Sequence, residues 1–247
     1  MIRKAGKKLT ETISCKPLAR RAFLLGASAF TLAGCVSTQQ ADPTMAPVAE
    51  FTPEPQVPLM YAALPNEQFP IPEVDVSKVD QKWWRNEVGY STTEKVGTVV
   101  VDTPNRYLYH VRPNGQAARY GVGVGRDGYA WAGQGHIAYK REWPRWRPPN
   151  EMVARQPELE PYSIDNGGMP PGLNNPLGSR ALYIHEGNRD TIYRIHGTPE
   201  FSSIGKSVSS GCIRMLNQDV IHLAANVRDG SAIVVIPDPA MSHLVVG

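Results

Sequence analysis

The sequence predicts a mainly β fold with one short helix near its C-terminal end, and two observations carry this prediction. From Val96 onward, short runs of β-branched and aromatic residues alternate with turn residues, as in a series of strands and hairpins. Only residues 217–230 place apolar side chains at helical spacing. The chain has 247 residues, 41% of them hydrophobic, which suits one globular domain with additional segments.

The expected strands are short and bounded by turn residues, of which Asn114 and Gly115 give the clearest hairpin signal. The strands are expected over residues 97–103, 106–112, 117–128, 135–141, 180–187, 190–197 and 231–237. In the single expected helix, Asn217 is the expected N-cap, Asp219 lies in the first turn and Gly230 ends it.

The first 34 residues are expected to be an export leader and not part of the fold. Seven Lys and Arg precede an apolar run of 13 residues, which is too short to span a bilayer. Arg20 and Arg21 before this run resemble a twin-arginine signal. The sequence LAGC that ends at Cys35 resembles the lipobox of bacterial lipoproteins, in which Cys35 becomes the lipidated residue. The alternative is cleavage to a soluble exported form; either way we expect the protein to leave the cytoplasm.

Loss of the leader changes the charge of the protein. The whole chain has a formal net charge of +3, and residues 1–34 carry seven Lys and Arg and one Glu, so the remainder is about −3. A nucleic-acid partner, which needs a basic face, is therefore not expected.

The organisation that we expect has four parts: the leader (1–34), a proline-rich tether and pre-domain segment (35–95), the folded domain (96–238) and a short tail (239–247). Residues 36–75 contain eight prolines and little periodicity, which predicts an extended tether. Trp83 and Trp84 are expected to pack onto the domain.

Cys212 is the residue that most needs an explanation. Once the leader is removed and Cys35 is acylated, it has no partner for a disulfide, and a free thiol in an oxidising compartment is a liability. It is either a buried, inert side chain or a nucleophile. His196 lies sixteen residues earlier and could serve as its base, while Gly211 before the thiol leaves room for backbone N–H groups to converge. Arg214 could hold a substrate carboxylate or form a structural salt bridge; both readings stay open.

Two other patterns are weaker. Gly123, Gly125 and Gly128 fit the G-x-G-x-x-G pattern of dinucleotide sites, but no helix is expected after them, so the match is taken as accidental. His185 and His222 do not have the spacing of metal ligands with His196 and Cys212, so no metal and no cofactor are expected.

The stretch from Tyr193 to Ile221, with HGT, SIGK and SSGCIRM, resembles the catalytic core of the YkuD-type L,D-transpeptidases over roughly residues 96–238. Many members carry His or Arg where this chain has Ser210. The resemblance implies a YkuD-like β-sandwich and an acyl-enzyme on Cys212. It also implies that His196 is the base and that the Gly197 carbonyl orients it. The expected oxyanion donors are the main-chain N–H groups of Gly211 and Cys212, and the expected substrate contacts are Ser209, Ser210 and Arg214.

The resemblance also implies a substrate, the bond between diaminopimelate and D-Ala in peptidoglycan stem peptides. Transfer to an amine would give a 3→3 cross-link or attach a lipoprotein. The alternatives are a hydrolase on the same scaffold and a wall-binding module that has lost its activity. The expected location is the periplasm of a Gram-negative bacterium, with the protein held to a membrane through a lipid at Cys35.

Residues 142–176 interrupt the strands with eight prolines. They are expected to form either a lid or cleft wall, or a packed surface loop. In the first case Trp143, Arg145, Trp146 and Arg147 would touch glycan or stem peptide.

Overall fold

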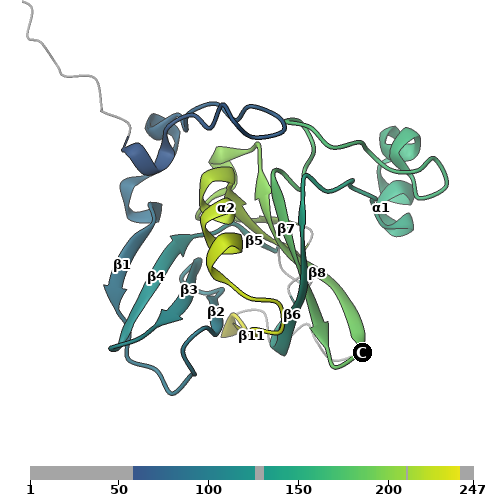
Figure 1. Cartoon of the computed structure of the whole chain (residues 1–247). Helices are drawn as coiled ribbons and strands as arrows, with labels where there is room; N and C mark the ends of the chain where they lie inside the picture. Colours follow the sequence, from purple (N-terminus) through teal and green to yellow (C-terminus); the bar gives the residue numbers. More distant parts are fainter. Residues whose placement is uncertain (1–57, 126–130, 210, 240–247) are drawn as a thin grey trace, which may run out of the picture. The chain divides into compact units, whose positions relative to one another are not determined.

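The computed structural model describes residues 58–125, 131–209 and 211–239, and it is built on a nine-stranded sheet with the order β1-β4-β3-β2-β11-β6-β7-β8-β10 (Figure 1). A second sheet pairs β5 with β9. The strands are β1 Asn86–Gly89, β2 Val99–Asp102, β3 Tyr107–Arg112, β4 Gln116–Gly121, β5 Val124–Gly125, β6 Gly133–Glu142, β7 Arg180–Glu186, β8 Arg189–Thr198, β9 Ser207–Ser209, β10 Ile213–Leu216 and β11 Ala232–Ile236. The α-helices are α1 Asn150–Arg155 and α2 Asn217–Asn226, and the 3-10 helices are η1 Leu59–Tyr61, η2 Val76–Lys78, η3 Gln81–Trp83, η4 Pro157–Tyr162 and η5 Phe201–Ser203.

Two neighbouring pairs in the large sheet are parallel, β11 with β2 and β10 with β8, and the others are antiparallel. The β8–β10 pair positions the candidate site. A parallel pair cannot be closed by a tight hairpin, so the chain needs a longer connection to return. Residues 199–212 form this connection, and they bring Cys212 to the start of β10.

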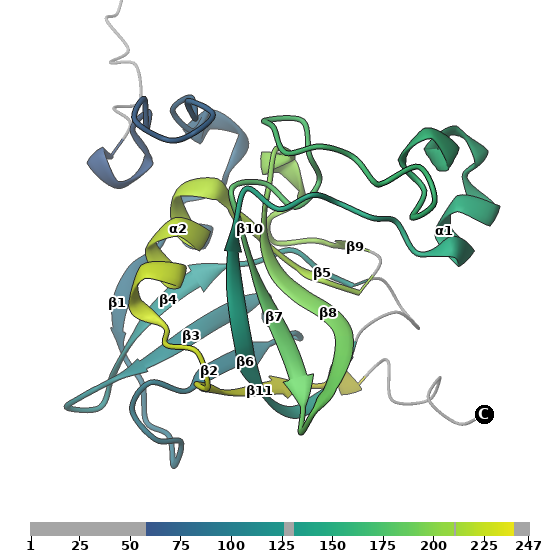
Figure 2. The ribbon, with the colours of Figure 1, turned by 45° about the vertical axis from the view of Figure 1, so that its right-hand side comes forward.

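The main hydrophobic core lies between the large sheet and α2. Helix α2 runs against the sheet (Figure 2), and its Val220 and Leu223 are fully buried among strand residues such as Leu182, Ile195 and Ile233. Full burial of each such side chain contributes about 1.5–3 kcal/mol. This packing fixes α2 directly after β10, so the helix holds the strand that follows the cysteine.

The prediction of a mainly β fold is confirmed. Every expected strand has a counterpart, but the run at 117–128 is divided into β4 and β5 by a break at Val122, and Gly123 forms an isolated β-bridge with Arg214. Strands β1, β9 and β10 were not predicted, because all three are short edge strands, and β1 and β9 also carry mostly polar or small residues. The G-x-G-x-x-G match was taken as accidental because no helix was expected after it. Residues 131–149 contain no helix, and residues 126–130, which include Gly128, lie outside the described residues.

The expected helix forms, but both of its predicted ends differ from those in the structure. Asn217 is the first residue of α2 and not its cap; Leu216 takes the cap position and provides no side-chain hydrogen bond. The side-chain oxygen of Asn217 instead accepts a hydrogen bond from the Ser179 main-chain N–H. The helix ends at Asn226 instead of Gly230, because Val227 is already extended and buried in the core. Gly230 has φ +84° and forms the turn into β11.

The part of the expected tether from residue 58 onward is folded. Tyr61, Val74, Val76 and Val79 form a second hydrophobic cluster with Ile204 and Leu216 of the domain. Trp83 and Trp84 pack against this cluster, as predicted. The indole of Trp83 lies directly over Gly205, where any Cβ would overlap it. Residues 36–57 of the expected tether lie outside the described residues, as do the leader, Cys35 and residues 240–247 of the tail.

A buried polar cluster ties this segment to α2. The carboxylate of Asp219, fully buried in the first turn of the helix, accepts a hydrogen bond of 3.2 Å from the Tyr61 hydroxyl and lies 3.6 Å from Arg85 Nη1. The Tyr61 hydroxyl in turn accepts the Arg85 main-chain N–H at 2.6 Å. Because the three residues come from separate segments, the cluster couples the pre-domain segment to the helix.

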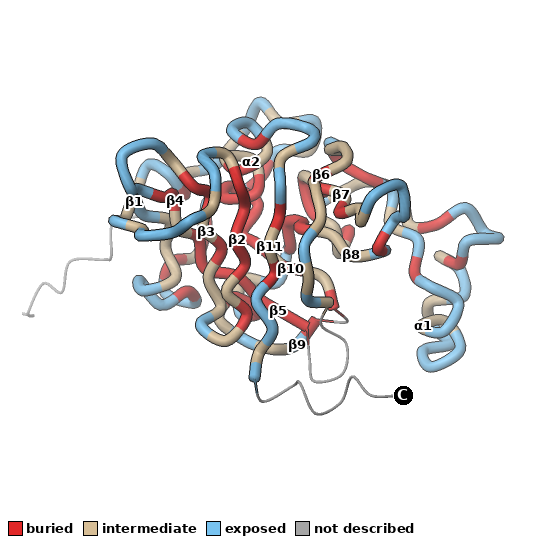
Figure 3. Tube along the Cα trace, turned by 90° about the horizontal axis from the view of Figure 1, so that it is seen from below, coloured by how far each residue is buried: buried red, intermediate tan, exposed pale blue. Residues whose placement is uncertain are grey.

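The proline-rich segment after β6 is mostly exposed, and its helix α1 contains no buried residue (Figure 3). Its first residues are structural: Trp143 is buried and donates to Glu67 Oε2 at 3.0 Å, and Arg145 donates to the Gly168 carbonyl at 2.8 Å. Glu67 also pairs with Arg180, at 2.8 Å. Trp143 and Arg145 are therefore occupied in holding the segment in place. No helix in the described part of the chain is long and apolar enough to cross a membrane.

Candidate active site

The register of β8 and β10 brings the predicted residues together. His196 is paired with Arg214, and Ile195 is paired with Ile213 in the core. Cys212 comes one residue before β10, at the level of Arg194. His196 and Cys212 are thus on adjacent strands and two positions apart, a Cα separation on the order of 8 Å from strand spacing and rise. Their side chains can bridge such a separation.

The imidazole of His196 is held in one tautomer. Its Nδ1 lies 2.6 Å from the Gly197 carbonyl oxygen, which can only accept, so Nδ1 carries the proton and Nε2 is left as the basic nitrogen. This agrees with the orienting role that was expected for Gly197. Burial lowers the pKa of His196 to about 4, the nearby Arg214 and Arg194 charges act in the same direction, and the Gly197 and Pro176 backbone carbonyls oppose it. His196 is therefore neutral near pH 7, as a general base must be.

A close contact with α2 explains why residue 197 is glycine. A Cβ at Gly197 would overlap Asn217 Oδ1, and one at Gly178 would overlap the same oxygen and the Gly197 backbone. Asn217 Oδ1 accepts from the Ser179 main-chain N–H at 2.9 Å. The Asn217 amide nitrogen donates to the Thr198 carbonyl at 3.4 Å, so this side chain links the start of β7 to the end of β8, next to the carbonyl that orients His196.

Cys212 is a free thiol and is half-buried. Burial raises its pKa above the ordinary value, while the Arg194 main-chain N–H and the charges of Arg194 and Arg214 lower it. With a thiol pKa that is raised and an imidazole pKa that is lowered, the pair rests as neutral thiol and neutral imidazole. Formation of the thiolate would therefore need a proton acceptor, for which His196 Nε2 is the candidate.

The loop before Cys212 is braced by Ser209. Its hydroxyl donates to the Cys212 carbonyl at 2.5 Å and accepts the Gly211 main-chain N–H at 3.2 Å. Gly211 has φ +117°, a conformation that favours glycine. The Gly211 N–H, an expected oxyanion donor, is engaged by Ser209 in this conformation, and the Cys212 N–H is the other expected donor. Ser210 lies outside the described residues.

Arg214 is paired with Glu200, whose Oε2 accepts from its guanidinium at 2.6 Å. Of the two readings left open by the sequence, this is the salt bridge. Glu200 is largely exposed, so the pair is accessible to a competing carboxylate.

Arg194 is the residue that sequence reasoning missed. Asp190 accepts two hydrogen bonds from its guanidinium, both at 2.7 Å, and the guanidinium stacks 4.2 Å from the centre of the Tyr183 ring. Tyr183 is paired with Arg194 across β7 and β8, and Tyr139 stacks on Tyr183 at 4.3 Å. The signal available in the sequence was the i, i+2 spacing of Arg194 and His196, which places both side chains on one face of a strand.

His222 and His185, the other two histidines considered in the sequence, have other neighbours. His222 Nδ1 is 2.8 Å from the Tyr120 hydroxyl, and His185 lies beside His136, with 6.0 Å between ring centres. Within the described ranges, no three His, Cys, Asp or Glu side chains converge as metal ligands would.

Comparison with known proteins agrees with this geometry. Residues 97–236 match the family model for the L,D-transpeptidase catalytic domain, YkuD. The chain belongs to this family. The match runs from just before β2 to the end of β11 and includes Cys212, His196 and Gly197, so the resemblance found in the sequence is confirmed.

Relatives named as L,D-transpeptidases show similar agreement. The chain is 32% identical to ErfK/SrfK of Escherichia coli (strain K12) over 57% of its own length and 44% of that protein. It is also 32% identical to YqjB of Bacillus subtilis (strain 168), over 57% of its own length and 71% of that protein. It thus spans less than half of the first of these relatives.

Among solved structures, a Brucella melitensis protein described as a probable carnitine operon oxidoreductase is 42% identical. The alignment covers 66% of this chain and 99% of that one, with a TM-score of 0.45. At this TM-score the likeness supports no statement about activity.

Proposed function

We propose that this L,D-transpeptidase-family protein acts on peptidoglycan stem peptides through a thioester on Cys212. The observation that supports this most directly is the neutral, buried His196 with Nδ1 held by the Gly197 carbonyl, on the strand next to the thiol. This is the tautomer in which Nε2 can take a proton from Sγ.

In the first half-reaction, Sγ attacks the carbonyl carbon of the diaminopimelate–D-Ala bond while its proton moves to His196 Nε2. The developing oxyanion faces the Cys212 main-chain N–H. The C–N bond then breaks, the proton passes from His196 to the D-Ala amine, and a thioester remains. In the second half-reaction an acceptor amine loses a proton to His196 and attacks the thioester, and Cys212 leaves as the thiol. A peptide amine would give a 3→3 cross-link, and a protein amine would attach a lipoprotein.

The deciding experiment is mass spectrometry of the purified protein incubated with disaccharide tetrapeptides. Loss of D-Ala with formation of dimers is expected. Loss of D-Ala with only tripeptide products would instead make water the acceptor and favour the hydrolase. Cys212→Ala should abolish turnover and His196→Ala should reduce it by about 100-fold or more. His222→Ala, a histidine on α2 that is bound to Tyr120, is the matched control and should retain activity. Turnover in the Cys212→Ala protein would refute the mechanism.

We also propose that the protein is exported and held to a membrane through a lipid on Cys35, because LAGC ends an apolar run after a basic stretch. Cys35→Ser should release the protein from the membrane fraction of cells. The lipid anchor is refuted if the Cys35→Ser variant stays in the same membrane fraction as the wild type and the mature N-terminus of the wild type carries no added lipid mass.

A further inference from the structure

A pocket lies away from Cys212 and His196. It is a half-open cavity of about 460 Å³ bounded by the segment before β2, the end of β3 and the turn between α2 and β11. Three strands (β11, β6 and β7) separate β2 from β8 in the sheet order. None of the residues that line it belongs to the candidate active site. The lining residues are Lys95, Val96, Gly97, Thr98, His110, Val111, Arg112, Pro113, Asn226, Arg228, Ser231 and Ala232.

The charged side chains that line the pocket are all positive. It contains three cations, Lys95, Arg112 and Arg228, and no Asp or Glu. Among the residues that the structure describes, none of these three cations forms an ion pair; Arg112 only donates to the Asn226 amide oxygen, at 3.3 Å. Cations gathered around a concave surface without a counter-charge attract anions.

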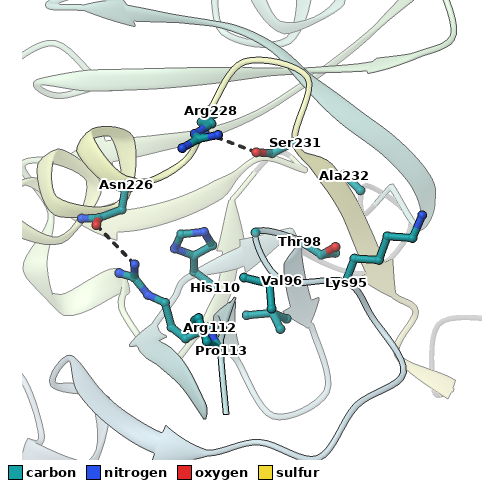
Figure 4. A pocket seen from close by; sticks show the side chains of 12 residues that line it. Lys95, Val96, Thr98, His110, Arg112, Pro113, Asn226, Arg228, Ser231 and Ala232 are labelled. Atoms are coloured by element: carbon teal, nitrogen blue, oxygen red, sulfur yellow. Dashed lines mark hydrogen bonds between the residues drawn. The ribbon is translucent and has the colours of Figure 1, made fainter. Parts of the chain in front are cut away.

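One residue of the pocket, His110, has a buried ring nitrogen without a hydrogen-bond partner among the described residues. Its side chain lies in the middle of the lining residues, between Arg112 and the α2–β11 turn (Figure 4). The residue is only 3% exposed, and its Nδ1 is buried with no hydrogen-bond partner among the described residues. Buried polar atoms are nearly always satisfied in native proteins, so an atom of this kind in a pocket-lining residue is a candidate contact for a bound molecule.

We propose that this cavity binds a small dianion of the phosphate or sulfate class, through Lys95, Arg112 and Arg228, with His110 as a further donor. Its volume is within the range of small-ligand sites. Three positive charges match a dianion better than a single carboxylate, and guanidinium groups can bind phosphate-type oxygens bidentately. The Ser231 hydroxyl accepts the Arg228 main-chain N–H at 3.2 Å, so its proton can point to the ligand.

The imidazole makes binding depend on pH. The charged groups that act on it are Arg112 in the pocket and His222 on α2, and Lys95 and Arg228 are the other cations that line the pocket. Burial, with Arg112 and His222, lowers the pKa of His110 to about 4. A bound dianion would offset these charges and raise that pKa, so the anion should bind more tightly as the pH falls.

The test is an NMR titration of the full-length protein with inorganic phosphate at constant ionic strength, following the His110 ring signals assigned with His110→Gln. A saturable shift is expected. Lys95→Ala/Arg228→Ala should weaken binding about tenfold or more, and it should leave the fold intact because both side chains are exposed. Lys78→Ala removes an equally exposed cation outside the pocket and is the matched control. No saturable shift, or the same affinity in the double variant and the control, would overturn the proposal.

Two further experiments test the role of His110 and the source of the phosphate group. Sulfate keeps its charge between pH 5 and pH 8, so its binding should strengthen towards pH 5; equal affinity at both values would overturn the role of His110. Vesicles of phosphatidylglycerol and of phosphatidylcholine distinguish a lipid phosphate from a free one. If the wild type sediments more with phosphatidylglycerol and the double variant loses this excess, the phosphate belongs to a headgroup. If free phosphate binds without such an excess, the ligand is soluble.

Discussion

Arg194 on β8 lies beside Cys212, the residue that precedes β10, and both its main-chain N–H and its guanidinium lower the pKa of the Cys212 thiol. The guanidinium is kept in place by two hydrogen bonds to Asp190 and by stacking on Tyr183. Burial alone would keep the thiol protonated, so this fixed cation makes the thiolate more accessible.

Arg194→Gln should therefore slow the alkylation of Cys212 severalfold between pH 7 and pH 9. Removal of the charge raises the thiol pKa further, so the rate profile should move to higher pH. Arg194→Lys keeps the charge and should restore part of the rate. Iodoacetamide labelling followed by intact mass gives the profile without any need for turnover. Arg189→Gln is the control, because it removes an exposed arginine of β8 that is paired with Glu186 of β7. An unchanged profile for Arg194→Gln would mean that Arg194 only supports the fold.

Gly197→Ala should both destabilise the protein and reduce its activity. The new Cβ would overlap Asn217 Oδ1 and crowd Val220, so either α2 or the end of β8 must shift. Overpacking of this kind typically costs about 1–3 kcal/mol in the free energy of unfolding. The same shift would move the carbonyl that holds His196 Nδ1, so kcat should fall more than the stability loss explains. Urea unfolding and turnover are the measurements. Gly89→Ala on β1, where nothing lies within 4 Å of the new Cβ, should change neither.

The predictions from sequence succeeded where the pattern was local. The strands around Val99–Val101 and Leu182–Ile184 are short apolar runs between turns, and the α2 stripe repeats at helical spacing, so each could be read from adjacent residues. Cys212 and His196 could be proposed as site residues because their neighbours form a dense motif. The Asn217 side chain was misread because its partner, the Ser179 N–H, lies 38 residues away.

What could not be predicted depended on pairing between distant segments. The role of Arg194 follows from the parallel register of β8 and β10, which no local pattern specifies. The folding of residues 58–85 onto the domain depends on contacts such as Tyr61 with Asp219, which are 158 residues apart. A proline-rich composition predicted an extended tether there, but buried apolar side chains at Tyr61 and Val74 offset the entropy of ordering it.

Trp83→Ala tests whether this segment contributes to the stability of the domain. Its half-buried indole covers Gly205 and packs with the cluster around Ile204. Truncation of a large aromatic side chain in such a position should cost about 2–4 kcal/mol in the free energy of unfolding. Thermal and urea unfolding of the full-length protein provide the values. Leu59→Ala in the same segment, whose side chain is 94% exposed, should have little effect. Equal stability of the two variants would show that the segment contributes no stability.

The last prediction concerns pH and Asp219. Burial raises the pKa of Asp219 to about 7, against the opposing effects of Arg85 and Tyr61. Between about pH 4 and pH 7 the folded protein therefore holds a proton that the unfolded chain has released. Stability must fall as the pH rises through this window, by up to about 1.4 kcal/mol per pH unit from this group.

Asp219→Asn cannot ionise, and its amide oxygen can still accept from the Tyr61 hydroxyl. We expect the variant to lose this pH dependence, so that the difference in free energy of unfolding between wild type and variant changes from pH 5 to pH 8. Urea unfolding at several pH values measures it. Glu158→Gln removes an exposed carboxylate of η4 and should keep the wild-type slope. If Asp219→Asn and wild type show parallel curves, Asp219 is already ionised at pH 5, and the attraction of Arg85 outweighs the cost of burial.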